Sequence, residues 1–433
     1  MTLKQSFHNF NHRLYLALLI LGLCPTIYTT ARVFFLGQLP GDWSFSIAGQ
    51  LSWVNLIYEV INEAIILPLF FFLGKDKKDK YVFSNRVRTG LLITFFVYVV
   101  LFALIMIFAR PLLFLMAADE SILEPSVSYI RIESIANIFS VLSQFSLVAL
   151  VSVNKSRYIY IITFLRLILS LVTDTFLVSS LPISLNLGVD GIGYSNIIVN
   201  LILFILTVVL LEKENIRVWR KERPDFRWTK EFFKIGGISG LESFVRNLAY
   251  MVMISRMVNV VGEQGTYWVA NNFIWGWLLL PVIQLGELIK EEVAENIENV
   301  KKKSLGYFAV TGVICVLWFL SIPLWKPFMI HILQFAEADK LYDLVLVLIG
   351  FYVLYAFQNV FDATFYGLGK TGYMLFESVV TNTVYYGIAF ILYIKGIWIP
   401  TLTGIALLFG IGMAFDSIVS FGAYWYMVRK ELG

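Results

Sequence analysis

Long apolar segments alternate with short polar ones along the whole chain. A helix needs about 20 consecutive, mainly apolar residues to cross the hydrocarbon core of a bilayer. Twelve segments meet this length, so we expect an all-α polytopic membrane protein with twelve transmembrane helices. They cover residues 14–36, 52–73, 87–109, 126–151, 158–178, 192–211, 233–261, 267–288, 305–327, 341–368, 373–394 and 403–428.

The composition agrees with this pattern and excludes several classes of protein. Of the 433 residues 58% are hydrophobic and 15% charged, whereas soluble domains are about half apolar and about a quarter charged. The net charge of +4 does not indicate nucleic acid, because the basic residues lie in the loops. Cys24 and Cys315 are isolated in apolar segments, and no metal cluster, Gly-rich phosphate loop or Ser/His/Asp arrangement is present. We therefore expect neither an enzyme nor a cofactor.

Lysine and arginine are concentrated in alternate loops, which predicts the orientation. Cytoplasmic loops carry an excess of these residues. The loops at residues 74–86 and 212–232 are strongly basic, whereas the opposite side has only Arg110, Lys326, Lys340 and Lys395. Both termini are thus predicted to lie in the cytoplasm, in a multi-pass protein of the cell (plasma or inner) membrane.

The longest internal polar stretch, residues 212–232, divides the chain into two halves of six spans, residues 1–211 and 233–433. The halves share a short turn after their fourth span. Residues 153–158 read Val-Asn-Lys-Ser-Arg-Tyr, and residues 368–373 read Leu-Gly-Lys-Thr-Gly-Tyr. A chance match of short turns is the alternative, but the equal helix count favours a repeat. Parallel repeats form two six-helix lobes related by a pseudo-two-fold axis along the membrane normal.

Several motifs, taken in order, resemble the multidrug and toxic compound extrusion (MATE) family of the multidrug/oligosaccharidyl-lipid/polysaccharide flippase superfamily. Residues 129–132 read Tyr-Ile-Arg-Ile, similar to the Tyr-x-Arg-Ile run of the family's fourth helix. Residues 187–195 resemble the loop into its sixth helix, and residues 367–371 the Gly-x-Gly-x-Thr turn after its tenth. Asp174 matches an acidic residue of the fifth helix, and Pro25 a first-helix proline.

The resemblance implies two lobes around a central cavity and export of cationic, amphipathic compounds. Transport would alternate between inward- and outward-open states and be driven by Na⁺ or H⁺. The chain departs from the family where coupling residues are expected. Arg32 replaces the usual first-helix aspartate, and Arg246 and Asn247 stand near the seventh-helix glutamate. In the tenth helix the acid falls near Phe357 and Gln358, with Asp362 a turn later.

Three carboxylates within spans are the candidates for ion coupling: Glu59, Glu63 and Asp174. A charge at the bilayer centre costs about 2.5–3.5 kcal/mol, so such residues are usually paired or functional. Glu59 and Glu63 are four residues apart and share one helix face. Two neighbouring carboxylates cannot both ionise cheaply, so one is expected to carry a proton. Arg32 is the expected partner of Glu59, and Arg166 that of Asp174; the alternative is that these pairs only fix helix packing.

A second set of residues is predicted to line the substrate cavity. Arg246 could meet an anionic group, or it could pair with Glu242 on its own helix. Trp275 could stack on a flat cation, and polar side chains nearby could bind substrate or join helices. Asp416 has no identifiable partner, and Glu133 and Glu377, near span ends, are interpreted as structural. The cavity set is Arg246, Asn247, Asn271, Asn272, Trp275, Gln358 and Asp362.

The sequence therefore predicts a secondary active transporter, a MATE-like exporter of a small amphipathic organic substrate coupled to H⁺ or Na⁺. It is expected to work as a monomer in the bilayer, with no nucleic-acid partner. One alternative is a lipid-linked oligosaccharide flippase of the same superfamily, which the arginines in the spans favour because its substrate is anionic. The other is a non-transporting receptor or scaffold in which the charges are simply paired.

Overall fold

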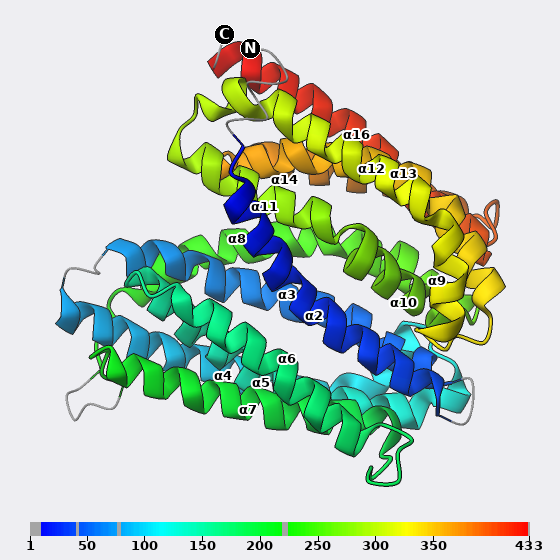
Figure 1. Cartoon of the computed structure of the whole chain (residues 1–433), viewed down its shortest axis with the longest axis horizontal. Coiled ribbons are helices and arrows are strands. Elements are labelled where there is room, and N and C mark those ends of the chain that lie inside the picture. The colour runs from blue at the N-terminus through cyan, green and yellow to red at the C-terminus, as the bar shows by residue number, and fades with distance from the viewer. Residues whose placement is uncertain (1–9, 40–42, 76–78, 219–223, 432–433) are drawn as a thin grey trace. The chain divides into compact units, whose positions relative to one another are not determined.

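The computed structural model describes residues 10–39, 43–75, 79–218 and 224–431, and every regular element in these ranges is a helix (Figure 1). The first half contains α2 (His12–Gly37), α3 (Ser44–Lys75), α4 (Lys80–Leu115), η1 (Glu120–Ile122), α5 (Leu123–Ser152), α6 (Arg157–Leu177) and α7 (Gly188–Lys213). The second half contains α8 (Thr229–Tyr250), η2 (Met251–Ser255), α9 (Arg256–Val260), α10 (Gln264–Phe273), η3 (Ile274–Leu278), α11 (Leu280–Glu295), α12 (Asn299–His331), α13 (Ala338–Gly367), α14 (Thr371–Val380), η4 (Thr381–Tyr386), α15 (Gly387–Ile394) and α16 (Leu402–Glu431).

The twelve predicted spans are confirmed as helical segments, although the helices extend beyond the predicted bounds by up to eight residues. In the described residues, nine helices are each long and apolar enough to cross a membrane. Gln264–Leu278 and Leu280–Glu295, which meet at an angle of 53°, pass the same test together and count as a tenth if they form one broken span. The remaining two predicted spans fall on α3 and on α8–α9, which carry Glu59, Glu63 and Arg246.

Three of the spans contain a short π-helical stretch. These are η2, η3 and η4, in the seventh, eighth and eleventh spans. Such interruptions shift the register of a helix by a residue and are frequent at functional sites. Each therefore changes which side chains of its span share a face.

The two lysine turns identified in the sequence have the same backbone conformation. Asn154 and Gly369 adopt left-handed φ values of 63° and 68°. In one turn the Lys155 N–H donates to the Leu150 carbonyl, and in the other the Lys370 N–H donates to the Phe365 carbonyl. Both are the six-to-one bond that closes a helix after a left-handed residue. The match in conformation supports the internal repeat.

The chain forms two compact units. Unit 2 is Gln38–Met251, in which α5 packs against α7, α4 and α3, and α3 packs against α8. Unit 1 is Met1–Gly37 with Val252–Gly433, in which α13 packs against α16, α11 and α12, and α2 packs against α11. The units differ from the two sequence halves at two helices, since α2 belongs with the second half and α8 with the first.

Candidate functional site

An ion triad joins α3 and α8 in unit 2. Arg246 Nη2 donates to Glu63 Oε1 at 2.6 Å and to Glu59 Oε1 at 3.2 Å. The two glutamates lie one turn apart and present their carboxylates to one guanidinium, as expected from their spacing. Within unit 2, Arg246 is thus a partner of Glu59 that the sequence did not identify. The expected pair of Arg32 and Glu59 would join the two units and stays a prediction.

Two other residues are sequence candidates for pairing with Glu59 or Arg246, namely Arg32 and Glu242. Arg32 belongs to unit 1, where its guanidinium carbon lies 5.2 Å from the centre of the Tyr28 ring. The side chain of Glu242 lies outside the described residues. Asn247 is buried beside the triad, and its amide lies 3.4 Å from Ser243 Oγ. Two carboxylates balance Arg246, so no positive charge is left over for an anionic ligand in this arrangement.

Two glycines allow α8 to come close enough for the triad to form. A Cβ at Gly236 would overlap the backbone carbonyl oxygen of Ala64, and one at Gly240 would lie 2.9 Å from Ala64 Cβ. The residues form a Gly-x-x-x-Gly pattern, which lets helix backbones approach closely in membranes. The contact holds Arg246 within reach of the glutamates.

Asp174 of α6 is completely buried in unit 2. The neighbouring face is polar, since the hydroxyls of Thr173 and Ser195 lie 2.5 Å apart between α6 and α7, and Ser170 is buried one turn earlier. Arg166 lies two turns before Asp174 on the same helix and is half-buried. The predicted roles of Asp174 in ion coupling and of Arg166 as its partner stay predictions.

Unit 1 contains a cluster of carboxylates around Gln358 of α13. The Gln358 amide nitrogen donates to Asp416 Oδ2 at 2.6 Å and to Asp362 Oδ2 at 3.2 Å. The neighbouring hydroxyls complete the cluster. Thr381 donates to Asp416 Oδ1 at 2.6 Å, Ser420 to Asp362 Oδ1 at 2.9 Å and Ser417 to Gln358 Oε1 at 2.7 Å.

The cluster supplies the partners of Asp416 that the sequence did not identify. The structure also corrects the expectation that Glu377 reaches water near its span end, since Glu377 is buried. Glu133 in unit 2 needs the same correction. It is buried and accepts a 2.6 Å bond from Asn196 Nδ2. Depth along a span did not predict burial, because helix contacts rather than distance from the span end determine access to water.

The remaining cavity candidates lie on α10 and η3 in unit 1. Asn272 donates to the Trp268 carbonyl of its own helix at 2.9 Å, and Asn271 lies beside it. Trp275 is exposed, and the Tyr355 ring of α13 meets it at an angle of 62° with the ring centres 5.6 Å apart. The structure therefore places the rings of Trp275 and Tyr355 in contact, and we call this pair the aromatic wall. Asn272, in contrast, bonds within its own helix.

The fold defines a polytopic helical membrane protein of two compact units. Comparison with known proteins shows which families and structures the chain resembles. The MatE family model matches residues 72–176. A search of the curated proteins found no match.

Solved structures match over nearly the whole chain. An inward-facing multidrug resistance MATE family transporter of the MOP superfamily is 17% identical, with a TM-score of 0.76 and 94% of each chain covered. An outward-facing structure of a transporter from that family is 16% identical, with a TM-score of 0.72, and the match covers 98% of this chain and 97% of that one. A MOP superfamily transporter from Pyrococcus furiosus is 17% identical, with a TM-score of 0.68, and the match covers 98% of this chain and 97% of that one. It is described as having a binding pocket of reverse polarity that suggests a different function. The resemblance noted in the sequence is confirmed, and the chain has the MATE fold.

Proposed function

We propose that this protein is a MATE-like secondary active transporter, which exports a small amphipathic organic substrate by alternating access coupled to H⁺ or Na⁺. The observation that carries the proposal is a set of carboxylates within the spans of a MATE fold, namely the buried Asp174 in unit 2 and the half-buried Asp362 and Asp416 in unit 1. Ionisable groups inside a membrane are expensive and mark ion pathways. The protein would work as a monomer in the cell membrane, with both termini cytoplasmic.

The carboxylates of the two clusters suit different roles. The hydrogen bonds described at Asp362 and Asp416 come from neutral donors, Gln358, Thr381 and Ser420. A carboxylate held by neutral donors can take up a proton or a Na⁺ ion without displacing a fixed cation. We therefore add Asp362 and Asp416 to Asp174 as coupling groups.

Glu59 and Glu63 would couple in a different way, because each already contacts Arg246. Protonation of Glu63 removes the charge that holds the guanidinium at 2.6 Å. Arg246 would then be free to change partners, so the triad would link ion binding to movement of α8 against α3.

The aromatic wall is the proposed substrate contact. The exposed ring of Trp275 and the neighbouring Tyr355 offer aromatic faces to a flat cation. Asn271, Asn272 and Asn247 would contribute hydrogen bonds. The flippase alternative draws on Arg32 and on the reversed pocket polarity described for the Pyrococcus protein, but the pairing of Arg246 with two carboxylates weighs against it.

Flux in proteoliposomes tests the proposal. Ethidium uptake is measured under an imposed pH gradient without Na⁺, and under a Na⁺ gradient at equal pH. We expect one gradient to drive uptake in the wild type, and Asp174→Asn and Asp416→Asn to lose the driven component. Glu298→Gln, which changes an exposed acid in a loop, should retain it.

Gradient-driven uptake that persists in both aspartate variants would contradict the site assignment. If the folded wild type moves ethidium under neither gradient, the exporter proposal fails for cationic amphiphiles. Movement of a headgroup-labelled anionic lipid in the same liposomes would then favour the flippase.

A further inference from the structure

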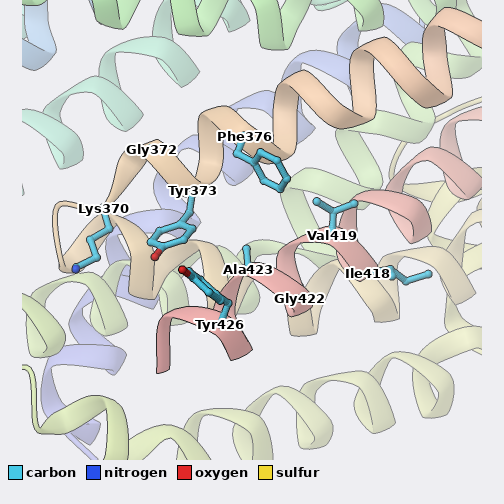
Figure 2. Close-up of a pocket in the computed structure, with 9 residues that line it drawn as sticks. All are labelled: Lys370, Gly372, Tyr373, Phe376, Ile418, Val419, Gly422, Ala423 and Tyr426. Carbon is cyan, nitrogen blue, oxygen red and sulfur yellow. The ribbon is translucent and has the colours of Figure 1, made fainter. Parts of the chain in front are cut away.

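A groove with one polar end lies between α14 and the last turns of α16, within unit 1 (Figure 2). Its volume is about 780 Å³. Figure 2 shows Lys370 and the hydroxyls of Tyr373 and Tyr426 toward one end, and Phe376, Val419 and Ile418 toward the other. The groove therefore has the polarity of an amphiphile, with a cationic end and an apolar body.

Small residues keep the groove open. Gly372, Gly422 and Ala423 line it, and a Cβ at either glycine would meet no atom within 4 Å. Large apolar side chains remain uncovered along its length, since Phe376 is 57% and Ile418 71% exposed. In a membrane protein, lipid covers exposed apolar surface of this kind. A groove in that surface fits an acyl chain better than it fits the flat face of another protein.

The polar end is reinforced by the last turn of α16. Arg429 lies over the Trp425 ring at 3.8 Å, and Lys430 lies over the Tyr426 ring at 5.5 Å. Together with Lys370, these residues place three cationic groups around the same end of α14 and α16. Both the Lys370 turn and the C-terminus are predicted to be cytoplasmic. Basic pockets between helices on that side suit anionic lipid headgroups.

We propose that this groove binds one anionic phospholipid of the cytoplasmic leaflet, with an acyl chain along Phe376, Ile418 and Gly422 and the phosphate at Lys370. The cationic end disfavours a cationic transport substrate, and the apolar body disfavours a small soluble anion. The site is separate from the carboxylates and from Trp275, so it does not depend on the proposed transport activity.

The repeat supplies a matched control. Lys155 occupies the position of Lys370 in the other lysine turn, and its ammonium lies 2.8 Å from a Glu214 carboxylate oxygen. Hydrogen bonds from Lys155 and Tyr158 hold the pKa of the Glu214 carboxyl below its ordinary value. Lys155 is thus a basic residue of matched position that does not line the groove, and we expect its substitution to leave lipid binding at the groove unchanged.

Native mass spectrometry of the delipidated full chain, titrated with phosphatidylglycerol or with phosphatidylcholine of the same chains, tests the proposal. The wild type should bind one phosphatidylglycerol more tightly than phosphatidylcholine. Lys370→Gln should weaken that binding about fivefold, the ratio equivalent to about 1 kcal/mol for a basic residue near an anionic headgroup. Lys155→Gln should bind like the wild type.

Gly422→Leu tests the apolar part, because the leucine fills open space and favours the helix more than glycine does. It should lower binding of both lipids while leaving the melting temperature of the lipid-free protein unchanged or higher. Glycerol phosphate should not compete with the lipid. Equal binding of the two lipids by the wild type, or unchanged phosphatidylglycerol binding in both Lys370→Gln and Gly422→Leu, would overturn the proposal.

Discussion

The partner of each acid within a span, more than its depth in the membrane, determines what it can do. Glu63 contacts a guanidinium at 2.6 Å, whereas Asp416 accepts its described hydrogen bonds from an amide and a hydroxyl. Breaking a buried ion pair leaves an uncompensated charge. A carboxylate held by neutral donors can change its protonation state without leaving a charged partner behind. The triad is therefore sensitive to changes that leave its charges unbalanced.

Substitutions in the triad should have unequal effects on stability. Arg246→Gln leaves Glu59 and Glu63 side by side without a cation, whereas Glu59→Gln keeps the shorter Arg246–Glu63 pair. We expect Arg246→Gln to destabilise unit 2 by about 1–3 kcal/mol, below the value for a fully buried pair because Glu59 is 43% exposed. Glu59→Gln should have little effect. Thermal unfolding in detergent measures both, and equal losses would contradict the charge-balance argument.

The sequence predicted one half of the triad and missed the other for a physical reason. Glu59 and Glu63 share a face because of helix geometry alone, which spacing reveals. Arg246 is 183 residues from Glu63 along the chain, and only the packing of α8 on α3 brings the two together. Gln358 reaches Asp416 in the same way, across 58 residues. Contacts of this kind leave no local pattern.

At the scale of helices, apolar length and turn chemistry are local signals, so the spans and lysine turns were predictable. The π-helical stretches and the assignment of α2 and α8 to units were not, because both depend on tertiary packing. The contact between α3 and α8 illustrates this dependence on tertiary packing at two neighbouring glycines. Gly236 meets the Ala64 backbone, whereas a Cβ on the next residue, Gly237, would meet nothing within 4 Å.

Gly236→Ala and Gly237→Ala form a matched pair that tests this contact. The first should push α8 away from α3 and lengthen the Arg246 contacts, because the added methyl overlaps backbone that cannot rotate aside. The second should be neutral or stabilise the helix by up to about 1 kcal/mol, as alanine does at an unstrained helical glycine. Thermal unfolding compares the two, and similar melting temperatures would contradict a close helix contact at Gly236.

At the scale of the whole molecule, the basic loops predict a direction for the fold across the membrane. Helix α12 has 33 residues, and at 1.5 Å per residue it is about 50 Å long, which exceeds the hydrocarbon core of about 30 Å. Its two ends must then lie on opposite sides. Two acids of almost equal exposure flank it, Glu298 at 62% and Glu337 at 61%, and each is paired with a lysine of a neighbouring helical turn.

Cysteine labelling at these two positions tests the predicted orientation. Both native cysteines are buried, so they can be retained, because a membrane-impermeant maleimide is not expected to reach them. In intact cells, a membrane-impermeant maleimide should label Glu337→Cys and not Glu298→Cys. After the cells are broken open, both positions should react at similar rates, because their exposure is matched. Labelling of Glu298→Cys in intact cells would reverse the topology and move the basic loops, Lys370 and the lipid groove to the outer face.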